Sequence, residues 1–442
     1  MRLILYRILS FLVLPLVLFA TWKRCKKYQK ARLQNPENPP LKHCVKSRFG
    51  LNPIAFKKGG IWIHAVSIGE TRSIFPLLNE LHKQYPNLPI TLTNGSTQGA
   101  IQSLNFAPID VQHQMVPFDY PFAVNRFLKQ LEPKLVIMVE TEIWPNLYQA
   151  CSNRHIPIIL VNARLKEDSF KAYQKWGGKM IANTLNQTQF IAAQSPIDAA
   201  FFSKLGATTD RVKMLGNLKF DMQISPTLLT ESAQWKQDNG LEQRFIWVAA
   251  STHADPLDAK AGKPEESLIL KAHQQLLTSL PSALLILIPR HAARFDAVAQ
   301  LLDESGLTWA RRSKNEAINT DTQVYLADSV GELMTWFAIC NVAFIGGSLV
   351  PFGGHNILEP AALSKPVLSG PHFNNLKALY QTFIEADAVQ IVDSPDQLSE
   401  VLFELAKNPE EQLQNGQKAY QCYQENSGAL HRLVNEIKLF LR

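Results

Sequence analysis

The chain is 442 residues long, which exceeds one typical domain and predicts two lobes. A hydrophobic fraction of 46% and a charged fraction of 19% exclude an intrinsically disordered chain. The net charge of +7 does not predict a nucleic-acid partner, because eight basic and no acidic residues lie in residues 1–32, and the remaining 37 Lys and Arg face 38 Asp and Glu.

The first predicted element is an apolar segment that runs from Leu3 to Ala20. Its length approaches the ~20 residues of a membrane-spanning helix, and a basic cluster follows it. We therefore predict a membrane anchor with a basic juxtamembrane segment in residues 1–32, either spanning or deeply interfacial. A cleaved signal peptide is the alternative, which fits less well because no small-x-small cleavage site is present. The Lys and Arg residues after the segment predict a cytoplasmic body.

The cysteines form neither a Cys-x-x-Cys motif nor a zinc-binding spacing. Their scattered positions and odd number predict unpaired thiols, which suit a reducing compartment. This agrees with a cytoplasmic body. The five residues are Cys25, Cys44, Cys151, Cys340 and Cys422.

Short apolar runs alternate with amphipathic segments along the rest of the chain. Runs of this kind, bounded by turn residues, predict buried parallel strands in βα units. Two series of them predict an α/β fold with two Rossmann-like, doubly wound domains facing a cleft. We expect these domains at 33–220 and 221–442, with an enlarged loop at 253–267. The clearest runs are "IWIHAVS", "LPITLTN", "KLVIMVE" and "IPIILVNA", then "FIWVAAS", "ALLILIPR", "VAFIGGS" and "KPVLSG".

Carboxylates follow two predicted strands of the first lobe. In "IWIHAVSIGET", the spacing of Ser67 and Glu70 matches a helix capping box, but Glu70 also suits a general base that takes a proton from an acceptor hydroxyl. The spacing alone leaves both interpretations open. In "MVETEIWPN", Glu140 and Glu142 lie at a further strand end. Two roles are open for these carboxylates. One of them orients an acceptor, or it pairs with Arg164 or Lys219.

Polar residues also end two predicted strands of the second lobe. Ser251 and His253 follow one strand in "AASTHADP", and Arg290 and His291 follow another in "ILIPRHAARF". Arginine is well shaped for phosphate, and ligands bind at the carboxyl ends of such strands. A solvated basic loop is the alternative for Arg290 and His291.

The stretch "FIGGSLVPFGGHNILEP" carries two glycine pairs after a third strand of this lobe. Gly346 and Gly347 begin it, and glycine lets a backbone approach a ligand closely. Asn356 can cap the next helix, whose free N–H groups attract anions, and Glu359 can accept ribose hydroxyls. An Asn-x-x-Glu capping box with glycines in tight turns is the alternative. The two pairs together with His355, at the carboxyl end of a strand, favour a nucleotide site.

Several motifs are missing from the sequence. No P-loop or Gly-x-Gly-x-x-Gly follows a predicted strand, which argues against ATP hydrolysis and dinucleotide binding. No Asp-x-Asp occurs, which argues against a divalent metal of the diphosphate-binding kind. We therefore expect neither a cofactor nor a metal.

Taken together, the motifs resemble those of the 3-deoxy-D-manno-oct-2-ulosonic acid (Kdo) transferases of lipopolysaccharide synthesis. The matching stretches are "HAVSIGE", "TNGSTQGA", "VPFDYP", "ETEIWPN", "NARL", "GNLKFD", "STH", "PRH" and "GGSLVPFGGHNILEP". The resemblance implies a GT-B fold and an inverting, metal-independent transfer of Kdo. The donor would be CMP-Kdo and the acceptor a lipid A precursor (lipid IVA), at the inner face of the cytoplasmic membrane.

The resemblance also implies roles for single residues. It makes Glu70 the general base. It assigns the CMP moiety to Arg290 and the glycine-rich stretch, and weaker acceptor or donor-sugar contacts to residues of the other motifs. The implied nucleotide-binding residues are Arg290, His291, Gly346, Gly347, Ser348, Asn356 and Glu359; the further contacts are Glu140, Glu142, Arg164, Lys219, Ser251 and His253.

The sequence departs from the family at one place. Family members usually continue "STH" with Glu-Gly-Glu-Glu, whereas "ADPLDAKAGKPEES" follows His253 here, which puts contacts near Ala254 in doubt. Two alternatives therefore stay open. One is another GT-B glycosyltransferase with a nucleotide diphosphate sugar, and the other is a membrane-tethered, non-catalytic nucleotide-binding protein.

Overall fold

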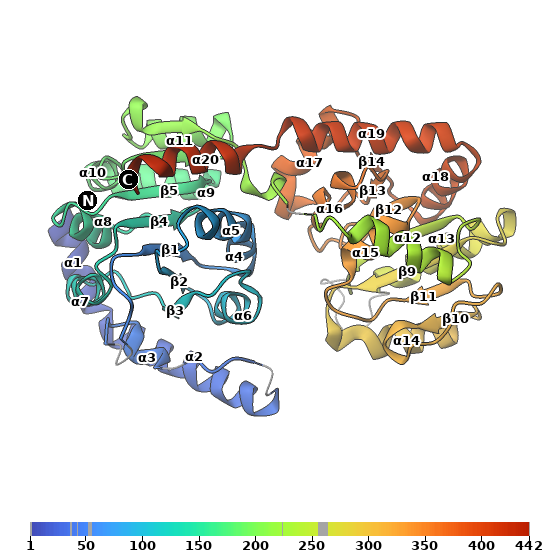
Figure 1. Cartoon of the computed structure of the whole chain (residues 1–442), viewed down its shortest axis with the longest axis horizontal. Helices are drawn as coiled ribbons and strands as arrows, with labels where there is room; N and C mark the ends of the chain where they lie inside the picture. Colours follow the sequence, from blue (N-terminus) through green and yellow to red (C-terminus); the bar gives the residue numbers. More distant parts are fainter. Residues whose placement is uncertain are drawn as a thin grey trace. The chain divides into compact units, whose positions relative to one another are not determined.

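A computed structural model describes residues 2–35, 38–41, 43–51, 55–222, 224–254 and 264–441. The enlarged loop expected at 253–267 lies largely outside these residues. The chain divides into two compact units (Figure 1). Unit 1 comprises Met1–Met222 and Ser427–Arg442, and unit 2 comprises Gln223–Asn426.

Unit 1 is built on a parallel sheet of seven strands in the order β3-β2-β1-β4-β5-β6-β7. Successive side chains of a strand point to opposite faces, so Ile61 and Ile63 enter one core cluster while Trp62 enters the other. Both faces of the sheet are therefore buried, which explains the continuous apolar runs. The strands are β1 Ile61–Ala65, β2 Ile90–Asn94, β3 Gln112–Met115, β4 Leu135–Val139, β5 Ile158–Ala163, β6 Ile191–Ala193 and β7 Val212–Met214.

Helices cover both faces of this sheet (Figure 1). Side chains of α7, α8 and α10 belong to the cluster around Trp62, and those of α5 belong to the cluster around Ile63. The helices are α4 Ile68–Ser73, α5 Phe75–Gln84, α6 Thr97–Phe106, α7 Pro121–Leu131, α8 Pro145–Ser152, α9 Glu167–Ala172, α10 Gly178–Leu185 and α11 Pro196–Lys204.

Unit 2 repeats the plan with seven parallel strands in the order β10-β11-β9-β8-β12-β13-β14. The predicted pair of Rossmann-like, doubly wound domains is thus confirmed. The strands are β8 Ile246–Thr252, β9 Leu284–Pro289, β10 Trp309–Arg311, β11 Val324–Leu326, β12 Val342–Ile345, β13 Val367–Ser369 and β14 Gln390–Ile391. The helices are α12 Leu228–Asp238, α13 Glu265–Ser279, α14 Phe295–Glu304, α15 Leu333–Ile339, α16 Leu358–Ala362, α17 Lys377–Glu385, α18 Pro395–Lys407 and α19 Pro409–Glu425.

The strand orders locate a switch point in each sheet. In unit 1 the chain winds outward in opposite directions from β1 and β4, and in unit 2 from β8 and β12. Ligands of open α/β sheets bind outside the carboxyl ends of strands at such switch points. The residues that follow these four strands are therefore the first candidates for a site.

The last helix, α20 (Ala429–Ile437), belongs to unit 1, whereas the sequence placed it in a domain at 221–442. Leu433 and Ile437 are buried in the unit 1 cluster around Ile63. The carboxylate of Asp221 accepts the N–H groups of Gly428 at 2.6 Å and Leu430 at 2.8 Å. These bonds satisfy free amides at the start of α20, so the chain returns to its first unit before it ends.

Two N-terminal helices, α1 (Leu3–Leu12) and α2 (Leu14–Gln34), precede the first strand. α1 lies beside α7 and α8 (Figure 1) and donates from Tyr6 Oη to Asp119 at 2.9 Å and from Arg7 Nε to Asn146 at 2.7 Å. In the part of the chain that is described, no single helix has the length and apolar composition of a membrane span. Among the described residues, only α1 and residues 14–33 of α2 taken together are long and apolar enough for a span, and the axes of these two helices are bent by 57° relative to each other.

The expectation that all cysteines are unpaired is wrong for Cys25 and Cys44, which form a disulfide. The two residues are 19 positions apart, and the chain folds back so that Cys44, at the start of α3 (Cys44–Ser47), meets α2 with a Cα–Cα distance of 6.0 Å. The spacing of the two cysteines in the sequence does not predict that the chain folds back in this way. The other three cysteines, Cys151, Cys340 and Cys422, are free and buried.

Candidate active site

Glu70 lies just after β1, at the switch point of unit 1, and its side chain completes a capping box. Its carboxylate accepts Ser67 Oγ at 2.8 Å and the backbone N–H of Val66 at 2.6 Å, while Ser67 Oγ accepts the N–H of Glu70 at 3.3 Å. The helix cap that the spacing of Ser67 and Glu70 predicts is therefore present in the structure. These bonds also hold the carboxylate in one orientation at the end of the strand.

Two further carboxylates, those of Glu140 and Glu142, affect the pKa of Glu70. Burial raises the pKa of Glu70, and the charges of Glu140 and Glu142 raise it further, against the opposing effect of the bonds from Val66 and Ser67. Glu140 and Glu142 follow β4, so the two strand ends of the switch point bring three acidic groups together. A carboxylate whose pKa is raised in this way is a stronger base than an exposed one.

Glu140 itself adopts a left-handed backbone conformation with φ of 62°. A residue other than glycine rarely takes this conformation, and it persists only where surrounding contacts enforce it. Lys219 Nζ lies 3.6 Å from Glu140 Oε1. Lys219 is positioned because the preceding N–H of Leu218 donates to Asn162 Oδ1 at 3.0 Å, from a bulge in β5. Of the two pairings considered from the sequence, the one with Lys219 is present.

Arg164 does not make the other pairing. Its backbone carbonyl accepts the hydroxyl of Thr141, but no ion pair joins its guanidinium to a carboxylate among the described residues. Arg164 is half-buried, next to the acidic strand end after β4. A half-buried guanidinium of this kind can bind an anionic group of a ligand.

His64 is a member of this site that the sequence analysis did not single out. It is buried inside β1, its Nδ1 lies 3.0 Å from the carbonyl of Thr93, and its Nε2 lies 3.6 Å from Glu142 Oε2. Trp144 Nε1 donates to the same carboxylate at 2.6 Å. The bond from Trp144 fixes the side chain of Glu142, and His64 lies beside it. The sequence feature that could have identified His64 is that it is a single ionisable residue within an otherwise apolar strand.

In unit 2, a fully buried carboxylate is one that the sequence analysis missed. Glu265, at the start of α13, has no exposed surface. It accepts the backbone N–H groups of Gly347 at 2.6 Å, Ser348 at 2.9 Å, Leu349 at 2.9 Å and His253 at 3.1 Å. Burial raises its pKa to about 7 against these four bonds. Glu265 thus holds together the loop after β12 and the end of β8.

This bonding changes the role of the first glycine pair. The N–H of Gly347 donates to Glu265, and the N–H of Gly346 donates to Ala250 O at 2.8 Å, so both amides already have partners within the chain. A Cβ on Gly346 would lie 2.9 Å from Glu265 Oε2, and one on Gly347 would lie 2.9 Å from the ring of His355. The glycines are therefore required by close approach of these two side chains. Ser348 is fully buried, and its hydroxyl bonds Ile345 O and Gly370 N.

The next residue, Glu266, is also fully buried and forms a bidentate pair with Arg294 at 2.8 Å for each bond. It also accepts Thr252 Oγ1 at 2.5 Å. Glu265 and Glu266 are the acidic pair that ends the inserted stretch after His253. The insertion therefore does not remove the acidic pair that usually follows "STH". Residues 255–263 of the insertion lie outside the described residues.

Three histidines gather at the carboxyl ends of β8, β9 and β12. The ring of His253 lies 3.5 Å from that of Phe352, 5.1 Å from that of His355 and 5.0 Å from that of His291. Nε2 of both His253 and His355 is buried and has no hydrogen-bond partner among the described residues. A buried polar atom without a partner costs roughly 1–3 kcal/mol, so these two atoms indicate a place for a ligand.

Charge around the histidines favours an anion. Arg290 is exposed and has no ion pair among the described residues, so its guanidinium is available to a ligand. Burial, followed by the charges of Arg290 and of neighbouring histidines, lowers the pKa of His355 to about 3. Burial and the charges of His291, Arg294 and Arg290 lower the pKa of His253 to about 4. The free site therefore contains neutral imidazoles beside a cation.

The remaining predicted residues lie near this cluster. Asn356 Oδ1 accepts the N–H of Leu358 at 3.3 Å, but the N-cap residue of α16 is Ile357, so Asn356 lies one position before the expected cap. The helix that carries Glu359 has only five residues, and its dipole is correspondingly short. Ser251 lies at a bulge of β8 with φ of 61°, where it re-aims the strand end toward His253.

The two units thus offer complementary chemistry. Unit 1 carries a carboxylate of raised pKa among other carboxylates, and unit 2 carries an arginine and two unpartnered imidazoles. The former suits removal of a proton from a hydroxyl, and the latter suits binding of an anionic group. In the described ranges, no group of three or more His, Cys, Asp or Glu side chains is arranged to hold a metal ion.

Comparison with known proteins gives consistent matches. A family model described as 3-deoxy-D-manno-octulosonic-acid transferase (kdotransferase) matches residues 43–222. The 3-deoxy-D-manno-octulosonic acid transferase of Haemophilus influenzae is 37% identical over 92% of this chain and 94% of its own. The C-terminal CMP-Kdo binding domain of WaaA from Acinetobacter baumannii is 38% identical and covers 45% of this chain and 98% of that domain, with a TM-score of 0.42.

A more distant structure supports the fold alone. The UDP-GlcNAc 2-epimerase from Neisseria meningitidis bound to UDP-GlcNAc is 13% identical, covers 86% of this chain and 99% of that chain, and has a TM-score of 0.54. With the two seven-stranded parallel sheets, this likeness confirms the GT-B fold.

A first prediction concerns pH. Because the pKa values of His253 and His355 are lowered to about 4 and about 3, both rings are neutral above pH 5. A bound anion favours the charged rings, so we expect sulfate to bind more tightly as the pH falls from 7.5 to 5, measured by calorimetry in two buffers of different ionisation enthalpy. Proton uptake on binding should vanish in a His253→Gln/His355→Gln variant. Sulfate affinity that is independent of pH would contradict this assignment.

The same depressed pKa values predict the stability of the ligand-free protein. Between pH 6.5 and about 4 the unfolded chain binds more protons at these two rings than the folded one, so stability is lost as the pH falls through this window. Sulfate should reduce that loss.

A second prediction concerns Glu265. Glu265→Gln replaces one acceptor oxygen by an amide donor, which leaves two loop N–H groups unpaired at roughly 1–3 kcal/mol each. We expect a lower melting temperature and weaker sulfate binding. Glu400→Gln, an exposed change on α18 with the same chemistry, should alter neither. Unchanged sulfate affinity in a folded Glu265→Gln variant would show that the loop does not depend on this carboxylate.

Proposed function

The chain belongs to the family of 3-deoxy-D-manno-octulosonic acid (Kdo) transferases, which are glycosyltransferases, and we propose that it transfers Kdo from CMP-Kdo to a lipid A precursor. The reaction proceeds with inversion at the anomeric carbon and without a metal. The observation that carries this proposal is the carboxylate group at the unit 1 switch point, where Glu140 and Glu142 raise the pKa of Glu70.

Unit 2 binds the donor. Arg290 pairs with the phosphate of CMP-Kdo, and the unpartnered Nε2 atoms of His253 and His355 bind the donor's anionic groups, which are the phosphate and the Kdo carboxylate. The domain of the Acinetobacter baumannii relative, named for CMP-Kdo binding, is 38% identical over 45% of this chain, which supports a CMP-Kdo donor. Ser348 and the first glycine pair contribute by holding the loop on Glu265 rather than by contact with the phosphate.

The chemical step uses Glu70 as the general base. Its carboxylate takes the proton of an acceptor sugar hydroxyl as the hydroxyl oxygen forms a bond to the anomeric carbon of Kdo. The bond from that carbon to the CMP phosphate breaks, and the electron pair leaves with CMP as a phosphate monoester. Arg290 stabilises the charge that develops on this leaving group. Attack opposite the leaving group inverts the anomeric configuration.

The other residues of unit 1 orient the acceptor. Lys219 pairs with Glu140, and Arg164 is free to bind an anionic group of the lipid A precursor. The bond from Trp144 fixes Glu142, beside His64, so that its charge stays near Glu70. No step needs a cofactor.

The N-terminal helices bind the cytoplasmic face of the inner membrane. α1 is fixed to the body by Tyr6 and Arg7, yet Ile4, Ile8 and Leu12 on its other side are 69%, 53% and 71% exposed. A helix with one docked and one exposed apolar side suits the membrane interface better than a straight span. The basic residues of α2 add attraction to anionic lipids, roughly 1 kcal/mol each.

The base is tested with Glu70→Gln. Glutamine is accepted in a capping box, so the fold should persist while the base is lost. The assay contains CMP-Kdo, a tetraacylated lipid A precursor and EDTA, and it measures CMP release and the mass of the lipid product. We expect the variant to transfer Kdo roughly 10²–10⁴-fold more slowly while it still binds CMP. Ser67→Ala, which weakens the cap but keeps the carboxylate, is the matched control and should retain most activity.

Three outcomes would separate the parts of this proposal. Full transfer by Glu70→Gln would leave Glu70 with its capping role only. Loss of transfer in EDTA that added Mg²⁺ restores would overturn the metal-independent mechanism. CMP binding without transfer by the unaltered chain would point to another donor sugar.

The membrane proposal is tested with Ile8→Ser/Leu12→Ser. Removing these side chains from the exposed side of α1 should weaken binding to vesicles with anionic lipid at least tenfold, because affinity scales with buried apolar area. Leu439→Ser, also at an exposed leucine, is the control in a cosedimentation assay. Equal binding of both variants would contradict a role for this face of α1.

A further inference from the structure

A second cavity lies in unit 2, at the opposite edge of the sheet from the donor residues. Its volume is about 460 Å³, and it is bounded by α12, the end of α15 and the start of α19. Asn341 directly precedes β12 and Lys365 lies two residues before β13, whereas the donor residues follow the carboxyl ends of the strands. The cavity is therefore separate from the proposed donor site.

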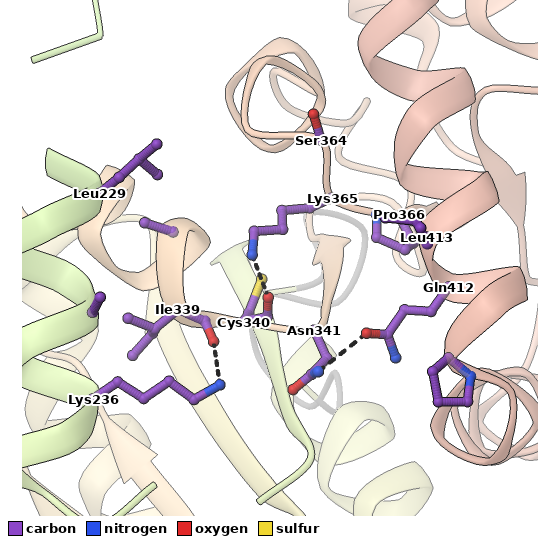
Figure 2. A pocket seen from close by; sticks show the side chains of 13 residues that line it. Leu229, Lys236, Ile339, Cys340, Asn341, Ser364, Lys365, Pro366, Gln412 and Leu413 are labelled. Carbon is purple, nitrogen blue, oxygen red and sulfur yellow. Dashed lines mark hydrogen bonds between the residues drawn. The ribbon is translucent and has the colours of Figure 1, made fainter. Parts of the chain in front are cut away.

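Two lysines enter this cavity from different elements (Figure 2). Lys236 Nζ, on α12, donates to Ile339 O at 3.4 Å, and Lys365 Nζ donates to Cys340 O at 2.8 Å. Each ammonium group has three donors, and these two bonds use one each. None of the residues that line the cavity is acidic. The two cations thus share one space whose lining contains no carboxylate.

Their proximity has an energetic consequence. Burial lowers the pKa of Lys236, and the charge of Lys365 lowers it further, against small opposing effects of Cys340 and Glu242. Two like charges in a half-enclosed space repel, and an anion between them removes that repulsion. Bonds to the carbonyls of Ile339 and Cys340, at the end of α15 and just beyond it, explain why each lysine is held, but they do not explain why two cations converge in a cavity whose lining contains no acid.

The amide side chains of the cavity are already paired. Asn341 Nδ2 donates to Gln412 Oε1 at 3.1 Å, Asn341 Oδ1 accepts Ile246 N at 2.9 Å, and Gln412 Nε2 donates to Leu405 O at 3.1 Å. The lysines supply the positively charged donors of the cavity. Lysine acts as a flexible point charge, so the cavity selects a compact anion of high charge, which describes a phosphate group.

The cavity also has an apolar side. Leu229 and Leu413 are 59% and 67% exposed, and Pro366 and Pro409 lie with them in the lining. Exposed leucines beside a cationic pocket favour a ligand with an apolar part next to its charge. We propose that this cavity is a second ligand site, which binds a phosphate group carried on an apolar body. The proposal is independent of the proposed catalytic function.

The site is tested on the full chain with hexyl phosphate, in the presence of saturating CMP so that the donor site is occupied. Lys236→Met and Lys365→Met keep the apolar stem and remove the charge, and we expect each to weaken binding at least tenfold by calorimetry. Lys271→Met removes an exposed charge on α13 that is paired with Asp396, and it should have no effect. Leu413→Ser, at an exposed residue, should weaken binding without unfolding the chain.

Simpler probes separate the two parts of the ligand. Hexanol should not bind, and inorganic phosphate should bind at least tenfold more weakly than hexyl phosphate. No binding of hexyl phosphate, or binding that both lysine variants retain, would overturn the proposal. Equal affinity for inorganic phosphate would overturn its apolar part.

Two sources can supply such a ligand, a phospholipid headgroup or a soluble organic phosphate. Dihexanoyl phosphatidic acid that binds more tightly than hexyl phosphate assigns the lipid source, and the reverse order assigns the soluble one. Either order supports the site only if Lys236→Met and Lys365→Met weaken that binding.

Discussion

All strands of a parallel sheet end at the same edge, and this constraint brings the site together in each unit. Glu70 and Glu140 are far apart in sequence, but they follow β1 and β4, which are neighbours at the unit 1 switch point. His253 and the glycine-rich loop meet in the same way after β8 and β12. The chemistry of the chain therefore depends on two strand pairings, and the connecting helices serve mainly to bury the sheets.

Half-buried or fully buried carboxylates satisfy backbone amides at several places in the chain. Asp119 accepts the first N–H groups of α8 and the hydroxyl of Tyr6, Asp221 accepts those of α20, and Glu265 accepts four N–H groups around the donor loop. In each case an acidic side chain satisfies amides that a helix or loop leaves open. Several residues of the sequence motifs are thus explained by backbone bonding rather than by contact with a ligand.

The sequence was sufficient for the fold, because apolar periodicity is a local property, whereas the strand ends proposed to carry the site stay a prediction. It was insufficient where a partner lies far away. Glu265 is 82 residues from Gly347, beyond an insertion, so the glycines were interpreted as ligand contacts. The Cys25–Cys44 disulfide and the return of α20 to unit 1 likewise depend on tertiary packing. His64 was hidden inside an apolar strand.

The two interpretations of Glu70, cap and base, are compatible on physical grounds. Bonds from Val66 and Ser67 stabilise the ionised carboxylate, which would by itself make it a weaker base. Burial and the neighbouring Glu140 and Glu142 act in the opposite direction, and the net pKa is raised. The cap then fixes the orientation of the carboxylate, while the surrounding negative charge keeps it basic. A residue selected for capping alone would not need two further carboxylates brought to it by the next strand of the sheet.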